Sequence, residues 1–210
     1  RKEEARRHDQ NAHDRAKRFQ CLTLLDTALY YKDEPFFHVW QADFTGRCYP
    51  VAATFNPQGN DLARALHRFH NGAAINDEKA KNWLGVAGAN HWGMSRCSYE
   101  ERIEWATTEG AALARQVASN PEATVSLWAN ADEPFQFVAW CIEWAGLLDK
   151  GFGFISKHPV LLDGSNNGYQ HIAAMTCDDE LAAKVNLINF NGIQDLYEEV
   201  RAELITELID

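Results

Sequence analysis

The segment HPVLLDGSNNGYQHIAA, residues 158–174, contains the change of pattern that decides the fold class. Its first half is a short apolar run that ends in Asp163, and such a run predicts a buried strand with a carboxylate at its end. Its second half begins a helix that we expect over residues 167–176. Because most other segments also show helical spacing, we expect an α+β fold that is mostly helical with a few short strands.

The rest of the chain carries local signals for further elements. Aromatic alternation in FFHVWQADFTGRCYPV, residues 36–51, predicts two short strands around a bend at Thr45-Gly46. Asn60 or Asp61 can cap the helix that follows the loop FNPQGND. Helices are expected at 1–31, 60–70, 76–90, 99–117, 132–148, 167–176, 178–188 and 193–209. In the fifth of these, one apolar stripe consists of Phe135, Val138, Cys141, Ile142, Ala145 and Leu148.

Length and composition indicate a folded protein. The 210 residues include 46% hydrophobic residues, 7 Trp and 11 Phe, which permit a sizeable core and exclude a disordered chain. We expect an N-terminal helical segment, residues 1–35, followed by one compact unit, residues 36–210, because no repeat or linker interrupts the sequence. No apolar run approaches the roughly 20 residues that span a bilayer, so no membrane partner is expected.

Charge and cysteine content bear on location and partners. We expect neither a secretory signal nor a transit peptide, because the start of the sequence is charged and contains acidic residues. Five widely spaced cysteines fit reduced thiols in a cytoplasm. The formal net charge is −10 at pH 7. Phosphate contacts need basic residues, so this acidic chain can bind nucleic acid only through a local basic surface or through a basic partner.

Asp163 is the candidate metal ligand. Mg²⁺ binds one or two carboxylates together with water and substrate phosphates, and Asp163 can offer one while the backbone carbonyl of Gly164 lies nearby. Read alone, Asp163-Gly164-Ser165 is a common turn. The apolar run before it and the polar NNGYQH after it favour the edge of an active site.

Three sites that contain basic residues stay open on local chemistry. The loop FNPQGND is either a proline turn with an ordinary helix cap or an anion cradle in which helix amides and Arg64 attract phosphate. Arg47, beside Gly46, is either a surface arginine or lies where another backbone can approach closely. His67 and His70 are spaced to share a metal, but no HExxH-type partner set accompanies them.

Several segments occur together in one order. They are DFTGRCYP (43–50), FNPQGNDLARALHRF (55–69), WLGVAGANHWG (83–93), SYEERIEW (98–105), DEPFQFVAWCIEWAG (132–146), DGSNNGYQHIAA (163–174) and QDLYEEV (194–200). From about Gln41 to Val200, this set resembles the palm region of single-subunit, DNA-dependent RNA polymerases of phages and mitochondria.

The resemblance implies a function and roles for individual residues. The reaction would be template-directed nucleotidyl transfer with two Mg²⁺ ions. Asp163 would be the first of two catalytic aspartates, with the carbonyl of Gly164 near the metals. Arg47 would lie beside the end of the RNA–template duplex, and Arg64 would touch the template. The segment through His171 would pack at the active site.

The sequence departs from the family pattern at three residues and lacks two of the family's motifs. Thr45 stands where an arginine is common, and Asn166-Asn167 replace smaller or sulfur-bearing residues. The family's nucleotide-gripping helix and its second aspartate have no counterpart here. The resemblance therefore implies a partial palm, completed by a second polypeptide that carries both motifs.

Such a chain would be one subunit of a split, heterodimeric phage polymerase or a piece of a longer chain. Its other partners would be template DNA, the RNA product and nucleoside triphosphates, in the host cytoplasm if phage-encoded rather than in a mitochondrion. One alternative is a non-catalytic assembly or promoter-binding subunit that retains the palm fold. A more remote one is a carboxylate-pair hydrolase that stacks sugars on its aromatic residues.

Overall fold

The computed structural model describes residues 2–161, 166–188 and 194–209. Its helices are α1 (Lys2–Tyr30), α2 (Asp61–Ala65), α3 (Glu78–Trp92), α4 (Tyr99–Thr107), α5 (Glu109–Ser119), α6 (Val125–Trp128), α7 (Pro134–Lys150), α8 (Asn167–Thr176), α9 (Asp179–Lys184) and α10 (Leu196–Ile209). Its strands form two antiparallel pairs, β1 (Trp40–Ala42) with β2 (Cys48–Pro50) and β3 (Ala73–Ile75) with β4 (Phe154–Ser156). The mostly helical α+β class is confirmed.

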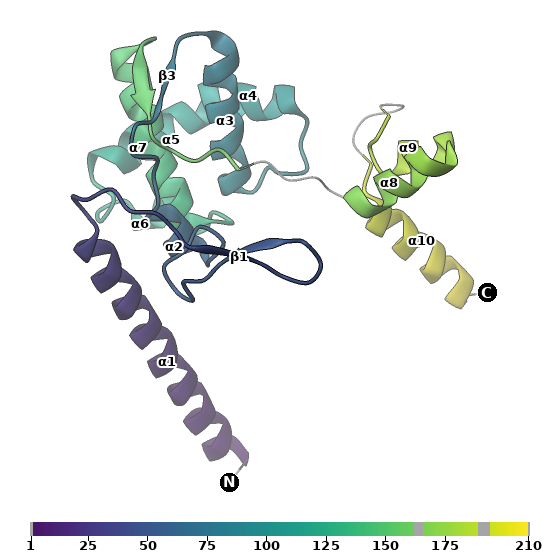
Figure 1. The fold of residues 1–210 in the computed structure, drawn as a ribbon, viewed down its shortest axis with the longest axis horizontal. Coiled ribbons are helices and arrows are strands. Elements are labelled where there is room, and N and C mark those ends of the chain that lie inside the picture. The colour runs from purple at the N-terminus through teal and green to yellow at the C-terminus, as the bar shows by residue number, and fades with distance from the viewer. Residues whose placement is uncertain (1, 162–165, 189–193, 210) are drawn as a thin grey trace.

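The body of the protein is built around α7, which packs against α2, α3, α5 and α6. Two parts extend from this body (Figure 1). Helix α1 projects from one side, and α8, α9 and α10, which follow β4 in the chain, form a small group at the right of the view. Within the described ranges, no helix is both long and apolar enough to cross a membrane.

Aromatic residues of α7 form the centre of the core. Phe137, Trp140 and Trp144 stack in sequence, with ring centroids 5.5 Å and 5.4 Å apart. The indole N–H of Trp140 donates to the Leu84 carbonyl at 2.8 Å, and that of Trp144 donates to the Ala106 carbonyl at 3.0 Å. Buried indoles need such partners, so these bonds also fix how α3 and α4 lie on α7.

Helix α3 approaches α7 closely at Gly88. A Cβ atom at this position would lie 1.9 Å from Cε2 of Trp140. We expect Gly88→Ala to lower the free energy of unfolding by about 3 kcal/mol, measured in urea, because a buried indole has no room to move aside. Gly168→Ala in α8 is the matched control, since nothing lies within 4 Å of its Cβ position. Equal stability of the two variants would contradict this α3–α7 packing.

Three predicted helices are shorter or divided. The helix expected over 178–188 is α9, which ends at Lys184. The helix expected over 60–70 ends at Ala65, because the chain turns to pair beside β4, where the Phe69 N–H donates to the Lys157 carbonyl at 3.0 Å. The helix expected over 99–117 is interrupted at Thr108 and resumes as α5. There the ring of Trp105 lies against Gly110, a residue that weakens helices.

The strand predicted from HPVLLD is wrong for the residues that the structure describes. Strand β4 ends at Ser156, residues 157–161 form no strand, and Val160 and Leu161 are 37% and 43% exposed. Pro159 has no N–H to donate to a ladder, which disfavours a central strand here. The end of the run, with Asp163, lies outside the described residues.

Candidate functional site

The candidate site lies where α2 meets the start of α7. The Asp61 carboxylate accepts hydrogen bonds from the backbone N–H groups of Phe135 at 2.8 Å and Gln136 at 3.0 Å, in the first turn of α7. Asn60 caps α2 itself, accepting from the Ala63 N–H at 2.9 Å. Asn60 therefore caps α2, whereas Asp61 caps α7. The negative charge of Asp61 also interacts favourably with the positive end of the α7 dipole.

Arg64 and His91 meet at Glu133, the residue before α7. Nη2 of Arg64 lies 2.5 Å from one Glu133 carboxylate oxygen, and Nδ1 of His91 lies 2.7 Å from the other. The Glu133 N–H also donates to the His91 carbonyl at 3.0 Å. The hydrogen bond from His91, helped by the charge of Arg64, lowers the pKa of Glu133 to about 2. This carboxylate is therefore ionised at neutral pH.

His158, five positions before Asp163 in the sequence, joins this contact. Its Nε2 lies 3.2 Å from Nε2 of His91, a residue that is only 2% exposed. Burial, reinforced by the neighbouring His91, lowers the pKa of His158 to about 3. His158 is therefore neutral at pH 7, and one hydrogen lies between the two rings. Arg64, Glu133, His91 and His158 form a continuous chain, called the polar chain below.

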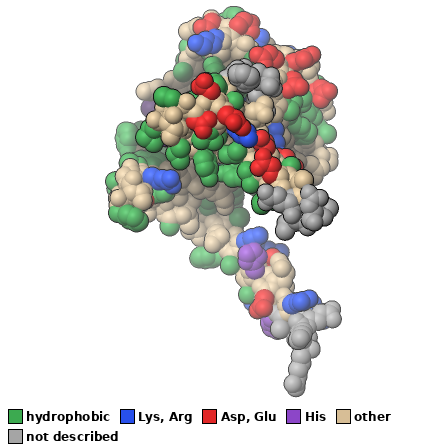
Figure 2. All heavy atoms as spheres, turned by 90° about the vertical axis from the view of Figure 1, so that its right-hand side faces the viewer, with side chains coloured by type: hydrophobic (Ala, Val, Ile, Leu, Met, Phe, Trp, Pro, Cys, Tyr) green, Lys and Arg blue, Asp and Glu red, His purple; other side chains and the backbone are tan. Residues whose placement is uncertain are grey.

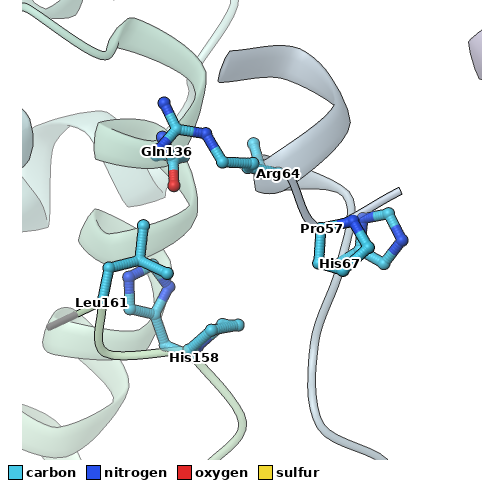
Figure 3. Close-up of a pocket in the computed structure, with 8 residues that line it drawn as sticks. Pro57, Arg64, His67, Gln136, His158 and Leu161 are labelled. Carbon is cyan, nitrogen blue, oxygen red and sulfur yellow. The ribbon is translucent and has the colours of Figure 1, made fainter. Parts of the chain in front are cut away.

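A small cavity of about 40 Å³ opens beside the polar chain. Figure 3 shows Arg64 reaching from α2 toward Gln136 of α7, with His158 and Leu161 on another side of the cavity. Nε of Arg64 is buried without a hydrogen-bond partner among the described residues. Such a cavity holds a few water molecules or one oxygen-bearing group. The lining residues are Pro57, Arg64, Ala65, His67, Gln136, His158, Pro159 and Leu161.

His67 pairs with His38 rather than with His70 in the described structure. The two Nε2 atoms are 2.9 Å apart, and Nδ1 of His67 lies 2.6 Å from the Ala63 carbonyl. Because that Nδ1 must donate, Nε2 of a neutral His67 accepts from His38. Phe55 stacks on the His67 ring at 4.3 Å. Within the described ranges, no group of three or more His, Cys, Asp or Glu residues is placed to hold a metal.

These histidines predict a loss of stability in mild acid. The folded state keeps His158 neutral down to a pKa of about 3, whereas the unfolded chain binds that proton below about 6.5. The contribution of neutral His158 to the free energy of unfolding is therefore fully present above pH 6.5 and is lost as the pH drops toward 3. Between pH 7.5 and 5 we expect a loss of about 2 kcal/mol from His158. Burial also lowers the pKa of His38 and of His67, which act in the same direction.

Urea unfolding followed by tryptophan fluorescence at pH 7.5 and pH 5 measures this loss. Glu133 adds nothing in this window, because its pKa is lowered to about 2 from 4.5 and its contribution is lost only between those values. His158→Gln removes the titrating group, so its stability should change less with pH than that of the wild type. An equal change in both proteins would contradict the assignment to His158.

The residues predicted from the sequence lie on different elements. Asp163 and Gly164 fall outside the described residues. Arg64 lies in the site just described. Arg47 is exposed in the β1–β2 hairpin, where its backbone N–H donates to the Asp43 carboxylate at 3.0 Å. His171 is exposed on α8. The structure thus brings Arg64 next to residues 157–161, which lead to Asp163, and leaves the roles of Arg47 and His171 as predictions.

The sequence model of the DNA-dependent RNA polymerase family matches residues 75–210 of this chain. The chain belongs to this family. Its type is the single-subunit polymerase of phages and mitochondria, as the resemblance implied. This chain is 35% identical to T7 RNA polymerase of Escherichia phage T7 over 170 residues, which are 81% of this chain and 19% of that protein.

Two further relatives extend this comparison. The DNA-directed RNA polymerase of Enterobacteria phage K11 is 31% identical over 211 residues, covering 100% of this chain and 23% of the relative. The mitochondrial DNA-directed RNA polymerase of Neurospora crassa is 34% identical over 188 residues, covering 89% of this chain and 13% of the relative. This polymerase chain therefore spans about a quarter or less of the length of these relatives.

The polar chain was not predicted from the sequence. Its members lie in segments that carry the family resemblance, apart from His158, but local spacing gives no sign that they touch. Arg64 and Glu133 are 69 positions apart, and His91 and His158 are 67 positions apart. The one signal in the sequence is His91 in the apolar segment WLGVAGANHWG. A histidine that is buried in such a helix needs a hydrogen-bond partner.

Proposed function

We propose that this chain forms part of a DNA-directed RNA polymerase that catalyses template-directed nucleotidyl transfer, and that it supplies Asp163 to the metal site. The family match carries the proposal, because it runs over residues 75–210 and so includes the DGSNNGYQH segment. The position of Arg64 beside His158, Pro159 and Leu161, which precede Asp163 in the sequence, is consistent with it.

Magnesium would be held by the Asp163 carboxylate with the Gly164 carbonyl nearby. Both are hard oxygen donors of the kind that Mg²⁺ prefers, but two donors do not complete an octahedral site. The remaining ligands would be water, substrate phosphates and the second aspartate that the family carries elsewhere. When bound, the metal ions stabilise the attacking and leaving oxygens of an in-line displacement.

Arg64 and Arg47 would contact the nucleic acid in an otherwise acidic chain. Figure 2 shows acidic side chains gathered on one face of the protein, which repels phosphate. Arg64 is fixed by Glu133 while its buried Nε has no partner among the described residues. The Arg64 side chain as a whole is 28% exposed, so it stays accessible to a template phosphate, and a charged contact of this kind is a strong one. Arg47 is exposed, so its guanidinium is accessible to a duplex.

Arg47→Ala and Arg64→Ala are expected to weaken binding of the assembled polymerase to an RNA–DNA scaffold. Each should reduce the slope of log affinity against log salt concentration by roughly one unit, because one phosphate contact is lost. Fluorescence anisotropy with a labelled scaffold at several salt concentrations measures both effects.

Two controls separate a phosphate contact from a general effect of charge. Arg64→Lys keeps a positive charge and should keep most of the slope. Arg115→Ala removes an exposed arginine from α5 and should leave the slope unchanged. Unchanged slopes in both Arg47→Ala and Arg64→Ala would count against a phosphate role for these residues.

Primer extension tests the proposed function. The purified chain is combined with a polypeptide that carries the remaining family motifs, and an RNA primer annealed to template DNA is supplied with nucleoside triphosphates and Mg²⁺. We expect extension that copies the template and requires both polypeptides. Extension that is equally fast when this chain is omitted would overturn the proposal.

A further inference from the structure

Two histidines join the segment after α1 to the end of α2. His38 lies between α1 and β1, and His67 lies two residues after α2. Their Nε2 atoms are 2.9 Å apart, and Nδ1 of His67 lies 2.6 Å from the Ala63 carbonyl. His38 and His67 are called the histidine pair below. The pair connects parts of the chain that are 29 positions apart.

The histidine pair lies at the small cluster that holds α1. The members of this cluster are Leu24, Ala28, Phe36, Phe55, Leu62 and Ala63. The ring of Phe55 stacks on His67 at 4.3 Å, and the ring of Phe36 meets His38 edge-on at 5.3 Å. Among the described residues, the larger core cluster around α7 has no member from α1. The direction in which α1 projects from the body (Figure 1) therefore depends on the small cluster and on the histidine pair.

The positions of the ring protons follow from the contacts of His67. The Ala63 carbonyl can only accept, so Nδ1 of His67 carries a hydrogen. In neutral His67, Nε2 is therefore an acceptor, and Nε2 of His38 donates to it. A second proton on His67 would place two N–H groups against each other across 2.9 Å, and the hydrogen bond would be lost. A second proton on His38 would go to Nδ1 and would leave the bond in place.

The surroundings of His67 oppose this second proton while the pair is closed. Burial lowers the pKa of His67, the hydrogen bond to Ala63 raises it, and the charge of His38 lowers it, so that the net shift is downward. The titratable groups that contact His67 or share its cavity are His38, Arg64 and His158. Arg64 is cationic and His158 is neutral at pH 7, so none of the three attracts a positive charge to the ring. Burial also lowers the pKa of His38.

We propose that the histidine pair is a pH-sensitive latch that fixes the direction of α1 and opens when His67 is protonated. The inference goes beyond the proposed function and does not depend on it. An open, solvated histidine binds a proton below about pH 6.5, so the open state becomes more populated as the pH falls from 6.5. Between pH 7.5 and 5, the equilibrium constant for opening rises by up to about thirtyfold for one such histidine.

Hydrogen–deuterium exchange of the full chain at pH 7.5 and pH 5 tests the latch, with labelling times scaled for the effect of pH on intrinsic exchange. Two peptides report on it, one covering residues 24–40 and one covering residues 60–70. In the wild type, we expect both peptides to exchange at least about tenfold faster at pH 5 than at pH 7.5. Equal exchange at the two pH values would overturn the proposal.

Peptides from α5 give the control for global unfolding. His158→Gln should lose less global stability between pH 7.5 and 5 than the wild type. In this variant, the two reporting peptides should keep the wild-type ratio of exchange rates, whereas the α5 peptides should change little. A ratio at residues 24–40 and 60–70 no larger than that at α5 would assign the effect to global unfolding and would overturn the latch.

Substitutions of His38 separate the latch from the packing around it. His38→Phe keeps a ring beside Phe36 but has no N–H, so both peptides should exchange fast at both pH values. A glutamine amide offers a donor and an acceptor, so His38→Gln can bond either form of His67 and should stay protected at pH 5. His70→Ala removes an exposed histidine outside the pair and should follow the wild type. If His38→Gln lost protection at pH 5 as the wild type does, the opening would not arise from two facing N–H groups, and the proposal would fail.

Discussion

Asp163→Asn is expected to abolish RNA synthesis by the assembled polymerase while the chain stays folded. Asparagine keeps the size of the side chain and one carbonyl oxygen but removes the negative charge that a divalent cation needs. Loss even of outer groups around a metal lowers activity 10–100-fold, so loss of a direct ligand should lower the rate more than about a hundredfold. Extension of an RNA primer on a pre-annealed scaffold measures the effect without promoter recognition.

Asp149→Asn is the matched control, because Asp149 is an exposed aspartate near the end of α7. It should leave the rate unchanged. Binding of the scaffold and of the second polypeptide should survive in Asp163→Asn, which separates a chemical defect from an assembly defect. If Asp163→Asn retained more than a tenth of the wild-type rate in a mixture that still needs this chain, an assembly or promoter-binding subunit would be the better description.

The sequence predicted those parts of the fold that depend on local chemistry. Asn60 is an N-cap because its side chain reaches an amide three residues ahead. Gly46 forms the bend of the β1–β2 hairpin because it adopts a φ of +81°. Strands β3 and β4 were not predicted. They have three residues each and pair across about 80 positions, with Ala73 opposite Ser156, and neither is long enough to show alternation.

The stripe predicted for α7 shows where periodicity fails. Cys141 and Ala145 are buried as predicted, whereas Phe135 and Ile142 are 43% and 53% exposed. The buried face is centred instead on the tryptophans of this helix, which stack in the core. Both faces of α7 are apolar, so spacing alone cannot choose between them. Gly85 and Gly88 of α3 decide which face is buried, because they leave room for the indoles of Trp144 and Trp140.

The sequence likewise predicted one part of the candidate site, Arg64, and missed another part, the polar chain. Arg64 was found as a basic residue one turn into a helix, since that depends on neighbours in the sequence. The polar chain depends on contacts between α2, α3, the start of α7 and the end of β4, and it is not visible before these elements are packed. The strand expected before Asp163 failed because Pro159 cannot join a ladder, although the apolar run resembles a strand in composition.

The purified chain alone is expected to be inactive and prone to aggregation. Several described elements expose large apolar side chains. On α1, Phe19, Leu22 and Leu29 are 71%, 60% and 66% exposed, and on α10, Val200 and Leu204 are 44% and 52% exposed. Large apolar side chains exposed in this number mark interaction sites or promote aggregation. Because the chain also spans at most 23% of the relatives compared above, we propose that polymerase segments absent from it cover these faces.

We expect the chain alone to be inactive because of the chemistry of the proposed metal site. One aspartate does not supply the ligand charge of a two-metal site, and no sequence here matches the family's nucleotide-gripping helix. A second polypeptide with these motifs should therefore bind tightly and bury well over about 2,000 Å², as obligate interfaces do. Light scattering and primer extension, on the chain alone and after coexpression with that polypeptide, measure both effects. A monodisperse chain that performs robust templated synthesis by itself would contradict this expectation, because it would mean that the second aspartate's role is met from within these 210 residues.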